Sequence, residues 1–238
     1  WKDKFSLLSP EPIVRPDREI GENFQRRAAS RSKEIDESVQ AGLKAMAKEL
    51  QVNESIIFMT ACSFAVNHLY KSDDIMFMTP IALRDNPATH SMIGYLVNSG
   101  LVYKQVSPWN KNRSDFVQDA KEWRDALRLS SVNTLPHGFL IKSFPNLRPN
   151  IQIGFQHMVS SDFIAEQSNS DLSGLQYKAY EMQKARDFIL KQSKMELFFW
   201  TRSDAVSLEY FAELFDTSTI DQLLDDVISI LTSLVSGV

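Results

Sequence analysis

The stretch of residues 54–70, ESIIFMTACSFAVNHLY, constrains the fold of this chain more than any other, because it is apolar on nearly all sides of a helix. Asn53, which precedes it, is a residue type favoured at the start of a helix. A helix that is hydrophobic all round has to be buried, in a protein core or in a membrane. Its longest apolar run, IIFMTACSFAV, is far shorter than the roughly 20 residues needed to cross a bilayer. We therefore expect a central helix in a soluble, cytoplasmic domain.

Helical and strand patterns alternate irregularly along the rest of the chain. Apolar residues three or four positions apart predict amphipathic helices over 35–50, over 112–131 and from 218 to the C-terminus, with a short helix after Pro136 as an option. The last of these opens with Ser218 and Asp221 in the spacing of a capping box. Runs of apolar, β-branched and aromatic residues predict strands over 73–83, 92–103, 150–158, 194–200 and 205–211, and a short one over 23–30. This order is too irregular for a doubly wound sheet and predicts an α/β fold.

One predicted strand, residues 92–103 with the sequence MIGYLVNSGLVY, contains residue types that strands disfavour. Glycine weakens the interior of a strand, and asparagine is uncommon there. Apolar residues on both sides still indicate a buried strand, so the glycine and the asparagine need a separate explanation.

Composition excludes several classes of function. The 238 residues suffice for one large or two small domains, and the 8 glycines argue against glycine-rich phosphate loops. A net charge of −4 provides no broad electrostatic attraction for nucleic acid. The single cysteine, Cys62, rules out an internal disulfide framework and fits a reducing compartment. The chain begins at Trp1, without an initiator methionine or a signal-peptide core, and we expect it to be part of a longer protein.

The first 22 residues are typical of an extended connector, because Pro10, Pro12 and Pro16 lie among charged residues. A locally basic region overlaps its end and consists of Arg15, Arg18, Arg26, Arg27, Arg31 and Lys33. Two interpretations stay open for these cations: a solvated linker with an edge strand, or a contact with an acidic partner.

No complete catalytic or metal-binding pattern is present. The four histidines are His68, His90, His137 and His157. None lies in a Cys/His cluster with metal-ligand spacing, and His68 and Cys62 are about 600° apart around one helix, so they face apart. Neither a G-x-S-x-G elbow nor a glycine-rich nucleotide-binding fingerprint occurs. His157 and Asp162 flank MVSS at the end of a predicted strand, and we interpret them as a chance polar pair.

The stretch IGYLVNSGLVYK, residues 93–104, resembles a motif of peptide-synthetase condensation domains, Ile/Val-Gly-x-Phe-Val-Asn-Thr. Four residues match the motif and two depart from it conservatively: Ile93, Gly94, Val97 and Asn98 match, and Leu96 and Ser99 depart. Other stretches resemble the same family in the same order, namely WKDKF before the proline-containing connector, residues 43–84, SKMELFFW, and VSLEYFAELFDTSTIDQLL. The joint match extends over nearly the whole chain.

The resemblance implies the C-terminal lobe of a two-lobed domain with a chloramphenicol-acetyltransferase-like fold, here a mixed β-sheet flanked by helices. Residues 1–22 would be the inter-lobe connector and residues 23–238 the lobe. In that family the motif lies near the channel where two carrier-bound substrates meet. Gly94 would let a phosphopantetheine arm approach the backbone, and Asn98 would offer it a donor and an acceptor. The structural alternative is that Gly94 marks a bulge and Asn98 satisfies neighbouring backbone groups.

The family's catalytic signature, two histidines followed after three residues by Asp-Gly, does not occur in this chain. The resemblance places that signature on the N-terminal lobe, so no catalytic residue is expected here, and whether the parent domain is an active acyltransferase stays open. In the family, an arginine of the C-terminal lobe is thought to pair with the aspartate of the signature. Arg84 stands at the corresponding position and would form this inter-lobe ion pair; the alternative is that it caps a turn beside Asp85.

The resemblance implies a domain that joins a carrier-bound acyl or peptidyl thioester to a carrier-bound acceptor amine or hydroxyl. This lobe would supply channel wall and carrier-docking surface, with substrates on phosphopantetheine arms and no metal or other cofactor bound directly. The expected partners are the N-terminal lobe and the donor and acceptor carrier proteins, with neither nucleic acid nor membrane. Two alternatives are a non-catalytic docking module that recruits carriers or a tailoring enzyme, and a free-standing acyltransferase that uses His137 or His157.

Other stretches depart from the family. NTLPHGF keeps a proline, a histidine and a phenylalanine of the family's His-Gln-Asp-Tyr-Pro-Phe in altered order, and LRPN is a reduced form of an Arg- and Asn-rich stretch. Val-Asn-Ser argues against an epimerization domain, and the Asp-Phe-Gly-Trp motif of plant acyltransferases is absent. These departures leave the substrate class open.

Overall fold

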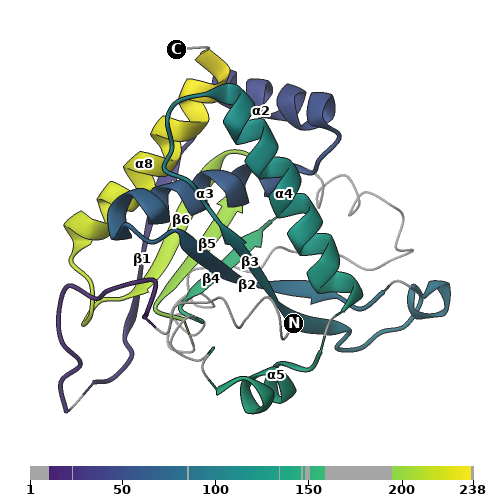
Figure 1. The fold of residues 1–238 in the computed structure, drawn as a ribbon, viewed down its shortest axis with the longest axis vertical. Helices are drawn as coiled ribbons and strands as arrows, with labels where there is room; N and C mark the ends of the chain where they lie inside the picture. Colours follow the sequence, from purple (N-terminus) through teal and green to yellow (C-terminus); the bar gives the residue numbers. More distant parts are fainter. Residues whose placement is uncertain are drawn as a thin grey trace, which may run out of the picture.

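The computed structural model describes residues 11–22, 24–84, 86–133, 135–145, 147, 151–158 and 195–236. Within them a six-stranded sheet has the order β1-β6-β5-β4-β2-β3. Its strands are β1 (Ala28–Glu34), β2 (Asp74–Ala82), β3 (Val97–Gln105), β4 (Ile153–His157), β5 (Leu197–Arg202) and β6 (Ala205–Phe211). The helices are α2 (Glu37–Leu50), α3 (Glu54–Tyr70), α4 (Arg113–Val132), α5 (His137–Ser143) and α8 (Thr217–Ser236), with a short 3-10 helix η1 (Pro87–Thr89). Helices α3, α4 and α8 lie over one face of the sheet, and α2 packs against α3 and α8 (Figure 1).

The sheet is mixed. β4 runs parallel to its neighbours β2 and β5, whereas the pairs β1–β6, β5–β6 and β2–β3 are antiparallel. The strands β1 and β3 are at its two edges. The predicted α/β fold, a mixed sheet flanked by helices, is confirmed.

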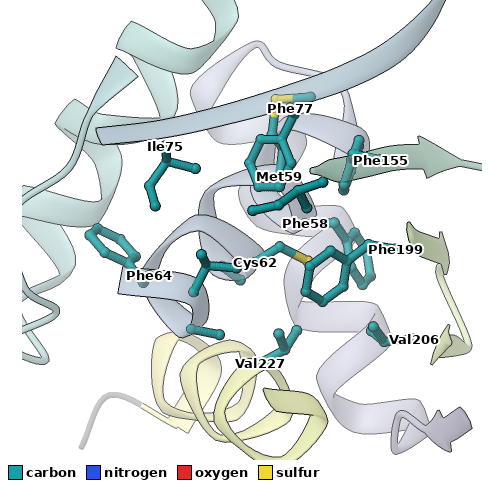
Figure 2. Packing of buried hydrophobic residues seen from close by; sticks show 14 of the residues in the cluster. Phe58, Met59, Cys62, Phe64, Ile75, Phe77, Phe155, Phe199, Val206 and Val227 are labelled. Carbon is teal, nitrogen blue, oxygen red and sulfur yellow. The ribbon is translucent and has the colours of Figure 1, made fainter. Parts of the chain in front are cut away.

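Helix α3 lies at the centre of the core, as its all-round apolar character predicts. Every residue from Ile56 to Asn67 is buried. On one side Phe58 and Cys62 lie close to strand residues such as Phe199, and on the other α3 faces Val227 of α8 (Figure 2). Each large apolar side chain that is fully removed from water in this way contributes about 1.5–3 kcal/mol to folding. In the described residues, none of the helices combines the length and apolar character that crossing a membrane requires.

The buried Trp123 of α4 shows how this core satisfies its polar atoms. Its ring lies 5.3 Å from that of Phe77, centroid to centroid, and its indole Nε1 donates to Ser63 Oγ at 3.1 Å. The Ser63 hydroxyl in turn donates to the carbonyl of Thr60, at 2.7 Å. A buried donor without a partner would be costly, so this chain of bonds fixes how α4 packs on α3.

Three predicted element boundaries are wrong. Residues 92–96 are not part of a strand, because β2 ends at Ala82 and its antiparallel partner β3 therefore begins at Val97. The first strand is β1, Ala28–Glu34, rather than 23–30, because its register is set by pairing with Ala205–Phe211. Helix α8 begins at Thr217, which places Ser218 inside it, so Ser218 and Asp221 do not form the predicted capping box.

The basic region has acidic partners within this chain. Its cations pair with carboxylates before and within α8: Arg18 with Asp216, Arg27 with Glu213, Arg31 with Asp221, and Lys33 with Asp225. Arg31 is bidentate, with both N–O distances at 2.9 Å. These four cations therefore pair with acids of their own chain, and Arg31 and Lys33 lie on β1, an edge strand as the first interpretation holds. Contact of the basic region with an acidic partner remains a prediction.

Candidate functional site at the β2–β3 hairpin

The motif recognised in the sequence lies at the open end of the β2–β3 hairpin. The two strands are in register from Asp74 opposite Gln105 to Ala82 opposite Val97. Beyond them the N–H of Leu83 donates to the carbonyl of Leu96 at 2.9 Å, which closes the base of a long loop. The motif therefore begins in the loop, with Ile93 and Gly94, and continues into the edge strand β3 with Val97, Asn98 and Ser99.

Arg84 organises this loop. Its Nη1 donates to the carbonyls of Thr89 and Met92, at 2.6 Å and 3.1 Å, and the Arg84 carbonyl lies 2.9 Å from His90 Nε2. The guanidinium thus caps a turn, as one of the two interpretations holds, but through Thr89 and Met92. Asp85 lies outside the described residues. The inter-lobe ion pair of Arg84 remains a prediction.

The tip of the loop presents apolar side chains to solvent. Ile93 is fully exposed, Tyr95 is 89% exposed, and Met92 is 53% exposed. In the described part of the chain, a Cβ atom on Gly94 would meet no atom within 4 Å beyond its chain neighbours, so no contact seen there requires a glycine. Because Gly94 belongs to no strand, the interpretation that it marks a bulge is wrong; the close approach of a substrate arm remains a prediction.

Asn98 and Gly100 connect β3 to the end of α4. The Nδ2 of Asn98 donates to the carbonyl of Leu135 at 2.9 Å, which fits the structural interpretation of this residue. Gly100 is buried, and a Cβ there would lie 2.0 Å from Ile81 Cδ1 and 2.9 Å from Ser130 Oγ. Sequence reasoning missed Gly100; the signal was a second glycine inside a predicted strand, which indicates a close approach of another element.

Exposed apolar residues gather around the motif. Ten large hydrophobic side chains are exposed in the described part of the chain, and eight of them belong to the hairpin, the end of α4 or α5. We call these eight the apolar end: Leu83, Met92, Ile93, Tyr95, Val97, Leu129, Val132 and Phe139. The hairpin loop, the C-terminus of α4 and α5 lie toward one end of the molecule (Figure 1). Contiguous exposed apolar patches are typical of interaction surfaces, so the apolar end is a candidate for one.

The histidines lie at separate places. His68 Nδ1, at the end of α3, is 2.9 Å from Asp226 Oδ2, and His90 lies in the hairpin loop. His137 begins α5, whereas His157 ends β4. Asp162 lies outside the described residues, so the His157–Asp162 pair stays untested. Among the described side chains, no group of three or more His, Cys, Asp and Glu is placed to hold a metal ion.

His157 is partly buried and packs beside the core. Its Nδ1 lies 2.9 Å from Thr201 Oγ1, and its ring centroid is 5.1 Å from that of Phe58. Burial lowers the pKa of His157 below its ordinary value, and the nearby Glu54 carboxylate opposes this shift in part. The ring is thereby favoured in its neutral form and contributes to packing.

A hollow of about 310 Å³ lies at the other end of β3, away from the motif. Its lining includes Phe64, Trp109, Lys104, Asp119 and Glu122. Lys104 pairs with Asp119 and, at 3.0 Å, with Glu122. Burial raises the pKa of Asp119 despite this lysine, whereas hydrogen bonds from Gln118 and Lys104 lower the pKa of Glu122. The lining carries one cation, Lys104, and three carboxylates, Asp115, Asp119 and Glu122, so acidic groups outnumber basic ones in this hollow.

Comparison with known proteins confirms the family resemblance. The family model described as "Condensation domain" matches residues 1–237. The malpinin synthetase of Mortierella alpina is 24% identical over 196 residues, which are 79% of this chain and 2% of that protein.

Solved structures show the same fold. The X-domain from teicoplanin biosynthesis has a TM-score of 0.73 at 17% identity, with 99% of this chain and 53% of that one covered. The condensation domain of the monacolin K polyketide synthase has a TM-score of 0.68 at 11% identity, with 95% and 53% covered. A four-domain nonribosomal peptide synthetase bound to AMP and glycine has a TM-score of 0.72 at 15% identity, with 95% and 18% covered.

The chain spans about half the length of these single-domain structures and a small part of the larger synthetases. Since the family model matches nearly every residue, this chain belongs to the condensation-domain family.

Proposed function

We propose that this chain is the C-terminal lobe of a condensation domain in a nonribosomal peptide synthetase or a hybrid synthetase. It would supply one wall of the substrate channel and part of the surface on which carrier proteins dock. The observation that carries the proposal is the apolar end, which surrounds the family motif, on a chain that covers about half of similar single-domain structures. The remaining half of such a domain would cover these side chains.

The reaction of the intact domain would be acyl transfer between two carrier proteins. The acceptor amine would form a bond to the carbonyl carbon of the donor thioester, the carbon–sulfur bond would break, and the amine proton would pass to the released thiol. An acceptor hydroxyl would give an ester in the same way. Positioning and proton removal are the main contributions expected of such an enzyme. This lobe would contribute positioning only, since the sequence lacks the two-histidine signature.

The partners we propose are the N-terminal lobe, which would cover the apolar end, and the donor and acceptor carriers. The substrates would reach the channel on the phosphopantetheine arms of these carriers. Gly94 would let an arm pass close to the backbone, because within the described residues no atom other than those of its chain neighbours lies within 4 Å of where a Cβ would be. Arg84 would hold the loop so that Ile93 and Tyr95 face the other lobe.

The test is condensation by the complete domain that contains this chain, with both carriers loaded and the product measured by mass spectrometry. Ile93→Asp should lower product formation at least tenfold without lowering the unfolding temperature of this lobe, because a carboxylate would be buried between the lobes. The matched control is Ser38→Asp, which adds the same charge at an exposed position in the first turn of α2. Equal activity of the two variants would contradict the placement of the other lobe.

A second variant addresses the arm. Gly94→Val should leave stability unchanged and lower product formation, since a branched side chain would occupy the space proposed for the arm. If the wild-type domain forms no amide or ester but still binds carriers or a tailoring enzyme, the domain is a docking module and not an enzyme. His137→Ala and His157→Ala variants that retain acyl transfer would dispose of a free-standing acyltransferase.

A further inference from the structure

The residues that follow Pro12 pack against the lobe instead of crossing solvent. Ile13 is 3% exposed, and Val14 is completely buried. The side chain of Gln152, itself buried, forms two bonds with the backbone of Val14. The N–H of Val14 donates to Gln152 Oε1, and Gln152 Nε2 donates to the carbonyl of Val14, both at 2.8 Å. The side-chain amide of Gln152 therefore pairs with the N–H and carbonyl of Val14 as the backbone of an adjacent strand would.

A second set of hydrogen bonds holds Asp17 and Arg18. Both backbone N–H groups donate to the carbonyl of Leu214, at 2.9 Å and 3.1 Å. In return the N–H of Asp216 donates to Asp17 Oδ2 at 2.7 Å. The Arg18 guanidinium donates to the carbonyl of Ala212 at 3.0 Å and pairs with the Asp216 carboxylate. We call residues 13–18 the strap.

The turn that receives the strap joins β6 to α8 and is held from its other side as well. Ala212 donates its N–H to the carbonyl of Arg27 at 3.0 Å. Glu213 accepts bonds from the N–H of Gln25 and from Arg27 Nε, at 3.0 Å and 2.8 Å, and these bonds hold its pKa below the ordinary value. The side chains of Leu214 and Phe215 are buried. The turn is thus anchored inward, while the Leu214 carbonyl and the Asp216 carboxylate hold the strap.

We propose that Gln152 and the turn 212–216 are positioning residues that dock the strap on this lobe. The inference rests on the proposed function, in which residues 1–22 join the two lobes. The strap then moves as one body with the sheet and α8, so residues 13–18 do not act as a hinge between the lobes. The direction in which the other lobe meets the apolar end is set by these contacts.

Hydrogen–deuterium exchange on this chain tests the docking without reference to any activity. Peptides that cover residues 13–18 should exchange at least tenfold more slowly than an unstructured segment. Gln152→Leu should raise exchange at Val14 at least tenfold, and Asp216→Asn should raise it at Asp17 and Arg18. Asparagine begins helices as well as aspartate does, so Asp216→Asn removes the charge without weakening the start of α8.

The matched control is Asp204→Asn, which removes an exposed carboxylate paired with Arg202 at a different turn. It should leave exchange over residues 13–18 unchanged. Fast exchange of the strap in the wild type would overturn the inference. Unchanged exchange over residues 13–18 in both Gln152→Leu and Asp216→Asn would overturn it as well. Asp216 is half exposed, so we expect Asp216→Asn to fold and to give an exchange measurement even if Gln152→Leu does not fold.

The positioning role is tested in the complete domain by the distance between spin labels, one on each lobe. Cys62 is buried, and burial raises the pKa of its thiol, so the Ser38→Cys variant can be labelled selectively on this lobe. Asp216→Asn should broaden the distance distribution and lower kcat at unchanged KM for the carriers, whereas Asp216→Glu should restore both. A distribution that Asp216→Asn does not broaden would overturn the positioning role. If neither the wild type nor any variant catalyses condensation, but residues 13–18 still exchange slowly, the proposed function is refuted and the docking of the strap stands.

Discussion

Two antiparallel hairpins in this lobe, β5–β6 and β2–β3, differ in how they are closed. Strands β5 and β6 are joined by two residues, Ser203 and Asp204, whereas β2 and β3 are joined by fourteen, residues 83–96. The short turn is tied to its surroundings, because Ser203 Oγ donates to Glu54 Oε2 at 2.7 Å and the Asp204 carbonyl accepts the N–H of Ile35 at 2.9 Å. The long loop is held mainly by Arg84 and exposes its apolar residues.

The difference in loop length distinguishes a turn that only connects two strands from a loop for which we propose a role in recognition. A two-residue turn closes a hairpin at the lowest cost in chain entropy, so a loop of fourteen residues needs another reason to exist. Loops of that length in compact domains commonly carry function on a rigid scaffold. Here the scaffold is the buried part of β2 and β3, and the recognition element that we propose is the loop with Ile93 and Tyr95. Variants in the two regions should therefore affect different properties.

The largest effect on stability is expected from Phe77→Ala, in the buried part of β2. Phe77 is fully buried, with ring centroids at 5.3 Å from Trp123 and 5.7 Å from Phe155. Loss of the ring should lower the free energy of unfolding by about 3–5 kcal/mol, measured by denaturant titration. Ile93→Ala in the loop should change it by less than about 0.5 kcal/mol. Similar losses for both variants would erase the distinction between scaffold and loop.

Two glycines give the next test. A Cβ on Gly154 of β4 would lie 2.2 Å from the ring of Phe198, which is itself stacked on Trp200 at 4.5 Å. Because that ring has little room to move, Gly154→Ala should destabilise the protein by about 1–3 kcal/mol. Gly94→Ala, in open space, should be neutral within about 0.5 kcal/mol in the same titration. A cost at Gly94 would mean that the loop packs more tightly than its exposure indicates.

The sequence predicted most of the scaffold, because its signals are local. The all-round apolar pattern of 54–70 identified the buried helix α3, and alternation with turn residues identified β5 and β6. The start of β3 at Val97 was not predicted, since it depends on where β2 ends. Exposed Ile93 and buried Val102 are equally apolar, so composition could not tell them apart.

The site was predictable only as a motif. Its residues were recognised by their order, but the contacts of Arg84 with two loop carbonyls depend on how residues 86–92 fold back. The partners of the basic region lie about as far away in the sequence as the chain allows: Arg31 and Asp221 are 190 positions apart. No local pattern encodes such a pairing; it follows from the placement of β1 beside β6, under α8.

His157, next to the β5–β6 hairpin, should make stability depend on pH. Burial lowers its pKa in the folded state, so the unfolded chain binds more protons once the pH falls below the ordinary value of about 6.5. The contribution of this residue is therefore fully present above that value and is lost as the pH falls through it toward the folded pKa. His157→Gln should flatten the decline of the unfolding free energy between pH 7.5 and 5.5. An unchanged slope would show that other groups cause it.

The smallest effects are expected from two arginines, one in each hairpin. Arg202→Ala removes an exposed ion pair with Asp204 and should cost about 0.2–1 kcal/mol, with no effect on hydrogen exchange beyond the β5–β6 turn. Arg84→Ala should cost no more in stability, yet it should raise exchange throughout residues 86–96, because it removes the bonds that fold the loop back on itself. Both substitutions should therefore lower stability only slightly, but Arg84→Ala should raise hydrogen exchange over a longer stretch of the chain. If exchange in the loop stays slow without Arg84, the loop is ordered by its own turns, such as the bonds of Asn86 to Ala88 and Thr89, and Arg84 is then available for the inter-lobe ion pair.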